Sequence, residues 1–134
     1  MRKVVIDTNA YSAFFSGDIS VRNAIVTADL VLMSTIVIGE LYFGFFGGTK
    51  FNQNKSQLES FLGKSNIQIA GITLETAEIF GEIQNELKSK GKPIPINDVW
   101  IAAQSVEAGA KLVTFDAHFH NVTGLRLWSL VADH

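Results

Sequence analysis

Four acidic residues from separate parts of the chain offer the most evident chemistry in this sequence. They are Asp7, Glu40, Asp98 and Asp116. Neighbouring carboxylates raise one another's pKa and burial opposes their ionisation, and a bound dication removes that cost. Oxygen ligands without thiolates favour Mg²⁺ or Mn²⁺. Because such an ion acidifies a bound water and stabilises charge on a phosphate, the four acids predict metal-assisted phosphodiester hydrolysis.

Each of these acids also has a structural explanation. Asp7 can cap a following helix, Asp98 can be an ordinary first-turn acid, and Asp116 can begin a turn. Glu40 can be a solvated helix residue, although the residues around it are mostly apolar. An acid in an apolar stretch usually has a partner, so Glu40 favours a site more strongly than the others do.

The elements that must position these acids follow from the hydrophobic pattern. Short apolar runs predict strands at Lys3 to Ile6, Leu30 to Met33, Ile67 to Ile69, Lys111 to Phe115 and Leu125 to Trp128. Helical spacing predicts helices at Ser20 to Ala28, Thr35 to Phe46, Asn52 to Leu62, Thr73 to Lys88 and Asn97 to Glu107. This alternation predicts one α/β domain over residues 1–134, with a central, mostly parallel β-sheet and helices on both faces.

The predicted sheet brings the four acids to one edge. Ligands gather beyond the carboxyl ends of parallel strands, where Asp7 and Asp116 stand. Glu40 lies about one and a half turns into the helix that follows the second strand. Gly91 and the prolines after it end the long helix opened by Thr73, and Asn97 is expected to cap the next helix, with Asp98 in its first turn.

Composition excludes several classes of protein. The 134 residues are 47% hydrophobic, and 11 basic against 13 acidic residues give a net charge of -2, so binding of nucleic acid by bulk attraction is not expected. The chain has no cysteine, which excludes disulfides, thiolate zinc sites and cysteine nucleophiles. Neither a signal peptide nor a membrane-spanning run is evident, so we expect a cytoplasmic protein that does not enter a membrane.

Four short motifs, in this order and spacing, resemble a known family. They are Val5-Ile6-Asp7-Thr8-Asn9, Gly39-Glu40-Leu41-Tyr42-Phe43-Gly44, Asn97-Asp98-Val99-Trp100-Ile101-Ala102-Ala103 and Thr114-Phe115-Asp116-Ala117-His118-Phe119. Together they resemble the PIN-domain ribonucleases, and among them the VapC-like toxins of type II toxin-antitoxin pairs. The resemblance covers nearly the whole chain.

The resemblance implies a Mg²⁺- or Mn²⁺-dependent endoribonuclease toxin that cleaves transfer or ribosomal RNA, forms a homodimer and binds a small VapB-like antitoxin. It implies that the four acids are the metal-binding and catalytic residues, supported by Thr8, Asn9 and Thr114. Thr8 can also be a helix cap, and Thr114 can equally be a β-branched strand residue without a role in the site.

His118 stands where many relatives carry a further acid, which leaves open whether one or two metals take part. His118 and His120 could share a metal if their segment were extended, but two loop histidines are more often solvated. Both are therefore left out of the predicted site.

Two other features bear on partners. Lysines 88, 90 and 92 precede Asp98 and can form a local basic rim for RNA, or a solvated face. The aromatic residues Tyr42, Phe43, Phe45, Phe46 and Phe51 exceed what a core of this size easily holds. Part of this aromatic stretch is therefore expected on the surface, as an interface, with core packing as the alternative.

Two other functions compete with the nuclease. A phosphatase with an aspartate after its first strand needs a second aspartate two residues later, where this chain has Asn9. A non-enzymatic interaction module would use only the aromatic surface, and it gives no reason to keep mutually repelling carboxylates.

Overall fold

A four-stranded parallel sheet forms the centre of the computed structural model, which describes residues 1–130; the last four residues of the predicted domain lie outside this range. The strands are β1 (Lys3–Ile6), β2 (Leu30–Ser34), β3 (Ile67–Ala70) and β4 (Lys111–Val113). In β1, Val4, Val5 and Ile6 are all buried, as expected for a strand covered on both faces. The predicted α/β class with a parallel sheet is confirmed.

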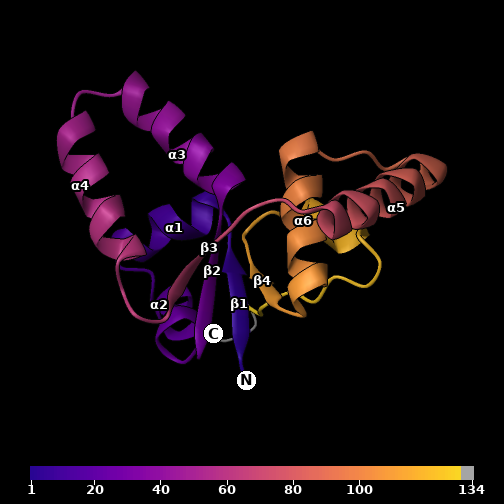
Figure 1. Ribbon diagram of the computed structural model, residues 1–134, viewed down its shortest axis with the longest axis horizontal. Coiled ribbons are helices and arrows are strands. Elements are labelled where there is room, and N and C mark those ends of the chain that lie inside the picture. The colour runs from indigo at the N-terminus through magenta and orange to yellow at the C-terminus, as the bar shows by residue number, and fades with distance from the viewer. Residues whose placement is uncertain (131–134) are drawn as a thin grey trace.

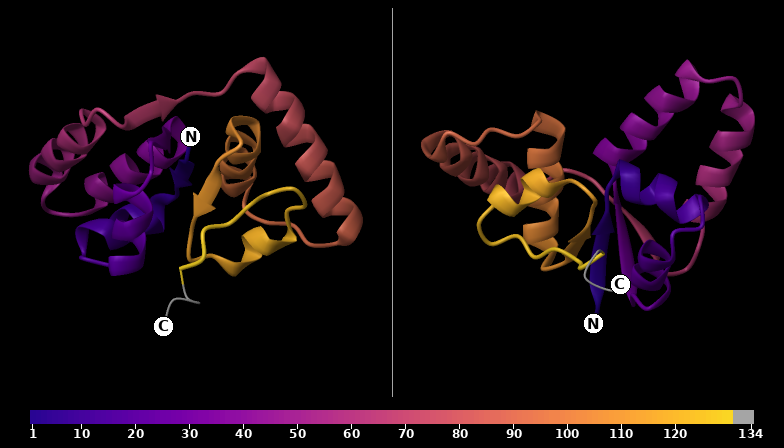
Figure 2. Two further views of the ribbon diagram at one scale, coloured as in Figure 1. Left: turned by 90° about the horizontal axis from the view of Figure 1, so that it is seen from below. Right: turned by 180° about the vertical axis from the view of Figure 1, so that it is seen from behind.

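Helices connect the strands, because parallel neighbours require a crossover. They are α1 (Thr8–Phe15), α2 (Ile19–Val26), α3 (Thr35–Gly47), α4 (Phe51–Leu62), α5 (Leu74–Lys90) and α6 (Ile96–Ala108), followed by the short 3₁₀ helix η1 (Ala117–Asn121). Figure 1 shows α1 to α4 on one side of the sheet and α5 with α6 on the other, and Figure 2 shows the same division. The predicted placement of helices on both faces is thus confirmed.

The order of the strands determines where a ligand can bind. The sheet runs β3-β2-β1-β4, so the chain moves outward from β1 to β3 and then returns to place β4 beside β1. In open parallel sheets ligands bind where the strand order reverses, beyond the carboxyl ends. Here that point lies between the ends of β1 and β4, which Asp7 and Asp116 follow.

The residues predicted to begin and end α5, Thr73 and Gly91, do so in the structure. The Thr73 side chain accepts a hydrogen bond from the Thr76 backbone N–H, and the Thr76 hydroxyl accepts one from the Thr73 N–H, which forms a capping box. At the other end Gly91 adopts φ +69°, a left-handed conformation that glycine accepts without steric cost. Local hydrogen bonds and backbone conformation therefore mark both ends of this helix.

Other boundaries differ from the prediction. The predicted cap Asn97 is wrong: α6 begins at Ile96 after Pro95, without a side-chain cap, and the Asn97 amide instead reaches Glu40. Strand β4 ends at Val113, because Thr114 turns its hydroxyl to Asp7. The predicted strand at 125–128 is also wrong, since that segment makes only an isolated bridge between Leu127 and Leu112.

Helix α1 was not among the predicted helices. Its eight residues include asparagine, serine, tyrosine and two phenylalanines, which are poor helix formers. The Asp7 cap and the burial of Ala10 and Tyr11 in the core stabilise it instead. Among the helices of residues 1–130, none combines the length and the apolar character needed to cross a membrane.

Candidate metal centre

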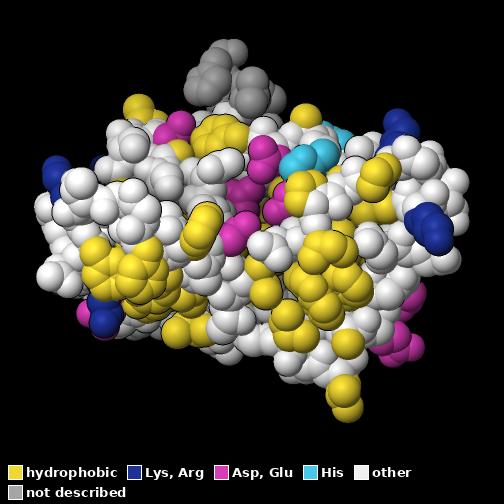
Figure 3. Space-filling view, turned by 90° about the horizontal axis from the view of Figure 1, so that it is seen from above, with side chains coloured by type: hydrophobic (Ala, Val, Ile, Leu, Met, Phe, Trp, Pro, Cys, Tyr) yellow, Lys and Arg dark blue, Asp and Glu magenta, His cyan; other side chains and the backbone are white. Residues whose placement is uncertain are grey.

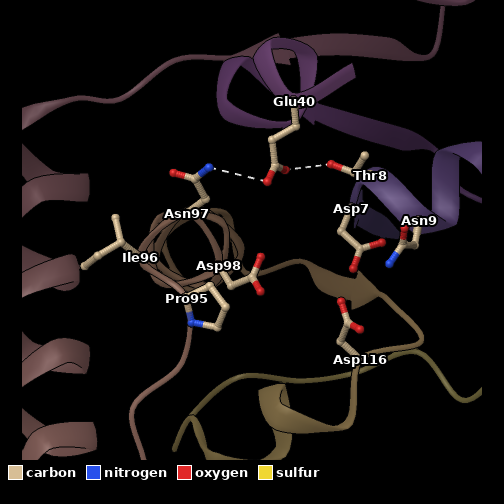
Figure 4. A pocket seen from close by; sticks show the side chains of 9 residues that line it. All are labelled: Asp7, Thr8, Asn9, Glu40, Pro95, Ile96, Asn97, Asp98 and Asp116. Carbon is tan, nitrogen blue, oxygen red and sulfur yellow. Dashed lines mark hydrogen bonds between the residues drawn. The ribbon is translucent and has the colours of Figure 1, made fainter. Parts of the chain in front are cut away.

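A cleft of about 510 Å³ opens at the carboxyl edge of the sheet, and it contains all four predicted acids. Its lining residues are Asp7, Thr8, Asn9, Glu40, Pro95, Ile96, Asn97, Asp98 and Asp116. Figure 4 shows the carboxyl groups of Asp7, Asp98 and Asp116 turned toward one another, with Glu40 reaching down from α3. Four separate segments thus bring carboxylates to the reversal point of the sheet.

Asp7 is held at three points where β1 becomes α1. Its backbone N–H donates to the Val113 carbonyl oxygen at 3.3 Å, and its Oδ1 accepts from the Ala10 N–H at 2.9 Å. Its Oδ2 accepts from the Thr114 hydroxyl at 2.5 Å. The residue is only 4% exposed, and burial raises its pKa from an ordinary 3.8 to about 6, although the two hydrogen bonds oppose that rise.

Asp98 faces the same cleft from the first turn of α6, where the positive end of the helix dipole favours a carboxylate. Burial raises its pKa, the hydrogen bond and charge of His118 oppose the rise, and the charges of Glu40 and Asp116 add to it. Glu40 and Asp116 line the same cleft as Asp98, so three carboxylates lie close together there. Asp98 therefore needs a positive partner more than an ordinary first-turn acid does.

Glu40 lies half-buried on α3 and is oriented from both sides. The Thr8 hydroxyl donates to its Oε1 at 2.6 Å, and the Asn97 side-chain amide donates to its Oε2 at 3.4 Å. The partner expected for an acid in an apolar stretch is therefore present. Asn97 is a site residue that the sequence did not indicate, because its position before Asp98 was explained as a helix cap.

Asp116 precedes η1 and makes no side-chain cap there. Its backbone N–H donates to the Thr114 hydroxyl oxygen at 3.0 Å, so Thr114 links Asp7 and Asp116 through one oxygen atom. Of the predicted supporting residues, Thr8 and Thr114 contact acids directly, whereas Asn9 is exposed and lines the cleft.

His118, excluded from the predicted site, contacts it. Its Nε2 lies 2.7 Å from Asp98 Oδ2, and one ligand atom each from His118, Asp98 and Asp116 lie within 4.8 Å of one another. His120 lines a different pocket, with Trp128. Residues two apart in a 3₁₀ helix point in different directions, so the two histidines do not share a metal here, contrary to what an extended segment would allow.

The donor set of the cleft fits a divalent cation. The four carboxylates supply hard oxygen atoms, which suit Mg²⁺ or Mn²⁺, and those of Asp7 and Asp98 resist ionisation without a positive charge nearby. The protein's own positive side chains do not compensate these acids: among the described residues, no lysine or arginine lines the cleft. Figure 3 shows dark blue side chains only at the margins of the face that carries the magenta cluster.

The predicted basic rim is only partly free to meet a substrate. Lys90 Nζ donates to the Asn121 carbonyl oxygen and to the Thr123 hydroxyl, and it pairs with Glu86 at 3.3 Å. Lys88 and Lys92 are exposed. Lys90, the central member of the lysine group, thus links α5 to the end of η1 and to the segment that follows it.

An α/β fold with four carboxylates at the strand-order reversal has the donor atoms to hold a divalent cation at the place where such folds bind ligands. The model of the PIN domain matches residues 4–125. This chain therefore belongs to the PIN domain family, as the four motifs indicated.

Curated relatives are VapC ribonucleases. Ribonuclease VapC2 of Rickettsia felis is 36% identical over 84 residues, which are 63% of this chain and 61% of that protein. Ribonuclease VapC1 of Haemophilus influenzae strain R2866 is 32% identical over 101 residues, which are 73% of this chain and 72% of that protein. The first alignment thus spans less than two thirds of the relative's length, and the second spans more than two thirds.

Solved structures are similar to this chain over a larger part of its length than these sequence alignments cover. One is the crystal structure of VapBC2 from Rickettsia felis bound to a DNA fragment from their promoter, with a TM-score of 0.82 and 29% identity over 93% of this chain and 96% of the other. Another is the crystal structure of DNA-bound VapBC from Salmonella typhimurium, with a TM-score of 0.84 and 25% identity over 96% of this chain and 100% of the other. The similarity in fold therefore extends over nearly the whole length of both chains.

Proposed function

We propose that this chain is a divalent-metal-dependent endoribonuclease that acts as the toxin of a toxin-antitoxin pair. The observation that carries the proposal is the meeting of Asp7, Glu40, Asp98 and Asp116 in one cleft of a PIN-domain protein. Relatives that are ribonucleases and neighbours that are VapBC complexes support the substrate class and the partner.

The four acids would hold Mg²⁺ or Mn²⁺, which supplies an activated water and stabilises charge on the phosphate. The protein's own contribution is orientation. Thr114 fixes the Asp7 carboxylate and Thr8 fixes that of Glu40, while the helix dipole of α6 favours the ionised form of Asp98. Carboxylates held in this way need little rearrangement when they bind a cation, which favours a well-defined metal geometry.

The charge of the chain becomes compatible with RNA once the cleft is filled. One dication changes the net charge from -2 to 0, and two change it to +2. We expect a structured RNA, such as a transfer or ribosomal RNA, as the substrate, which would place the protein in the cytoplasm. We also expect residues 1–134 to act as one domain.

Substitution of Asp98 tests the nuclease. Purified protein with Mn²⁺ should cleave RNA, and Asp98→Asn should lose cleavage by a factor of about 10² or more, because it removes a metal ligand without changing side-chain size. Asp29→Asn is the matched control, since Asp29 is exposed and accepts from the Arg2 N–H at the opposite edge of the sheet. Sequencing of RNA ends after induction of each variant would also name the substrate. Equal cleavage by the wild type, Asp98→Asn and Asp7→Asn would refute the proposal.

The aromatic stretch on α3 and α4 supports a protein partner. Phe43 is 83% exposed and Phe46 73% exposed, whereas Tyr42, Phe45 and Phe51 are half-buried. Figure 3 shows hydrophobic side chains on both sides of the acidic cleft. Part of the stretch is thus on the surface, as predicted, and exposed apolar patches of this kind mark interfaces.

We propose that a small VapB-like antitoxin covers Phe43 and Phe46 and that the toxin itself is a homodimer. Phe43→Ser with Phe46→Ser should weaken co-purification with the antitoxin, whereas Ile19→Ser, on the equally exposed surface of α2, should not. Light scattering of the toxin should give the mass of two chains. A monomeric mass at micromolar concentration would refute the dimer, and unchanged antitoxin binding would refute the aromatic interface.

A further inference from the structure

His118 lies beside the acidic cleft and contacts one of its four acids. It lies in η1, where the neighbouring Phe119 is completely buried and therefore fixes the orientation of this short helix. The His118 ring packs against the Phe119 ring at a centroid distance of 4.8 Å, and its Nε2 lies 2.7 Å from Asp98 Oδ2. The imidazole is thus held at the cleft rather than free in solvent.

The distances suit coordination of one ion. Ligand atoms about 2.1 Å from a metal are about 3.0 Å apart when adjacent and about 4.2 Å apart when opposite in an octahedral shell. The ligand atoms of His118, Asp98 and Asp116 already lie within 4.8 Å of one another. Coordination of one ion would bring these atoms to separations of no more than about 4.2 Å. Side-chain exposures of 32% for His118 and 16% for Asp98 leave the group open to an entering ion.

We propose that His118 is a nitrogen ligand of a divalent cation that it shares with Asp98 and Asp116. The metal centre of this chain is then a mixed nitrogen and oxygen site, not an all-carboxylate one. Imidazole nitrogen is a better ligand for divalent first-row transition metals than for Mg²⁺, which prefers oxygen ligands throughout. His118 therefore shifts the preference of the site from Mg²⁺ toward Mn²⁺ and Co²⁺. The inference rests on the proposed metal-dependent function and specifies its metal.

Pulsed electron paramagnetic resonance of bound Mn²⁺ tests this assignment. The full-length chain is stripped of metal and given one equivalent of Mn²⁺. Modulation from a coordinated ¹⁴N nucleus should appear, and it should change to the ¹⁵N pattern when the protein is made with ¹⁵N-histidine. His118→Gln should lose the modulation, and His120→Gln should keep it, because His120 faces another pocket.

Calorimetry gives a second measurement that does not depend on activity. His118→Gln should weaken Mn²⁺ and Co²⁺ binding by about tenfold or more and Mg²⁺ binding by less, and His118→Asp should restore Mg²⁺ binding. Bound Mn²⁺ without histidine modulation in the wild type, or modulation that persists in His118→Gln, would overturn the role of His118 alone. Absence of Mn²⁺ binding in the wild type would overturn it together with the metal-dependent function.

Discussion

Asp7 makes the stability of the metal-free protein depend on pH in an unusual direction. Burial raises the pKa of this carboxyl from 3.8 to about 6, so the folded state favours its protonated form. Between these two pH values the unfolded chain loses the proton while the folded chain keeps it. The contribution of Asp7 to stability therefore falls as pH rises from 3.8 to about 6, and it stays constant above that range.

The size of the effect follows from the pKa values. A rise from 3.8 to about 6 corresponds to about 3 kcal/mol, and Asp7 is too buried for solvent to screen much of it. Asp7→Asn cannot ionise, yet its amide oxygen can still accept from the Ala10 N–H and its amide nitrogen can donate to the Thr114 hydroxyl oxygen. We therefore expect Asp7→Asn to be more stable than the wild type by up to about 3 kcal/mol at pH 7.5 and by almost nothing at pH 4.

Urea unfolding at pH 4, 5, 6 and 7.5 in the presence of a chelator measures this difference. Other groups also titrate in this range, so the quantity of interest is the variant minus the wild type at each pH. Glu59→Gln, which removes an exposed carboxylate from α4, controls for the loss of one negative charge. Added Mn²⁺ should then stabilise the wild type more than Asp7→Asn. A difference between Asp7→Asn and the wild type that is the same at every pH would refute the reasoning.

Three other substitutions test the structure. Thr114→Val removes the donor to Asp7 and the acceptor for the Asp116 N–H, so urea unfolding at neutral pH should show a loss of about 1–3 kcal/mol and a steeper pH dependence. The Tyr11 hydroxyl is buried without a hydrogen-bond partner among residues 1–130, so Tyr11→Phe should match the wild type or exceed its stability by about 1–2 kcal/mol; a clear loss would contradict this. Gly91→Ala should cost about 1 kcal/mol, measured by thermal unfolding, because φ is +69° there.

The fold could be predicted where neighbours in sequence decide the structure. The run Val4 to Ile6 reads as a buried strand because every side chain is β-branched, and Thr73 with Gly91 marks the ends of α5 by local hydrogen bonds and backbone conformation. The common location of the acids followed from one rule, that the carboxyl ends of parallel strands share an edge. None of these inferences requires knowledge of side-chain packing.

The remaining features depend on contacts between distant segments. His118 reaches Asp98 only because burial of Phe119 orients η1, and the sequence around it resembles an ordinary polar loop. Asn97 lies inside α6, which begins at Ile96, and its side chain donates to Glu40, a residue 57 positions away. The local signal that could have indicated His118 is its place two residues after Asp116 and next to Phe119, an aromatic residue that the core buries.

The charge of the cleft residues, more than their hydrogen bonds, argues for a ligand. An asparagine at position 7 would cap α1 as well as Asp7 does, and a glutamine at position 40 would still accept from Thr8. An asparagine at position 7 or at position 98 would not carry the energetic cost that burial and repulsion impose on ionised Asp7 and Asp98. The fold thus accounts for polar atoms at these positions but not for negative ones. An interaction module would lose nothing by neutralising them, whereas a cation site requires the negative charge.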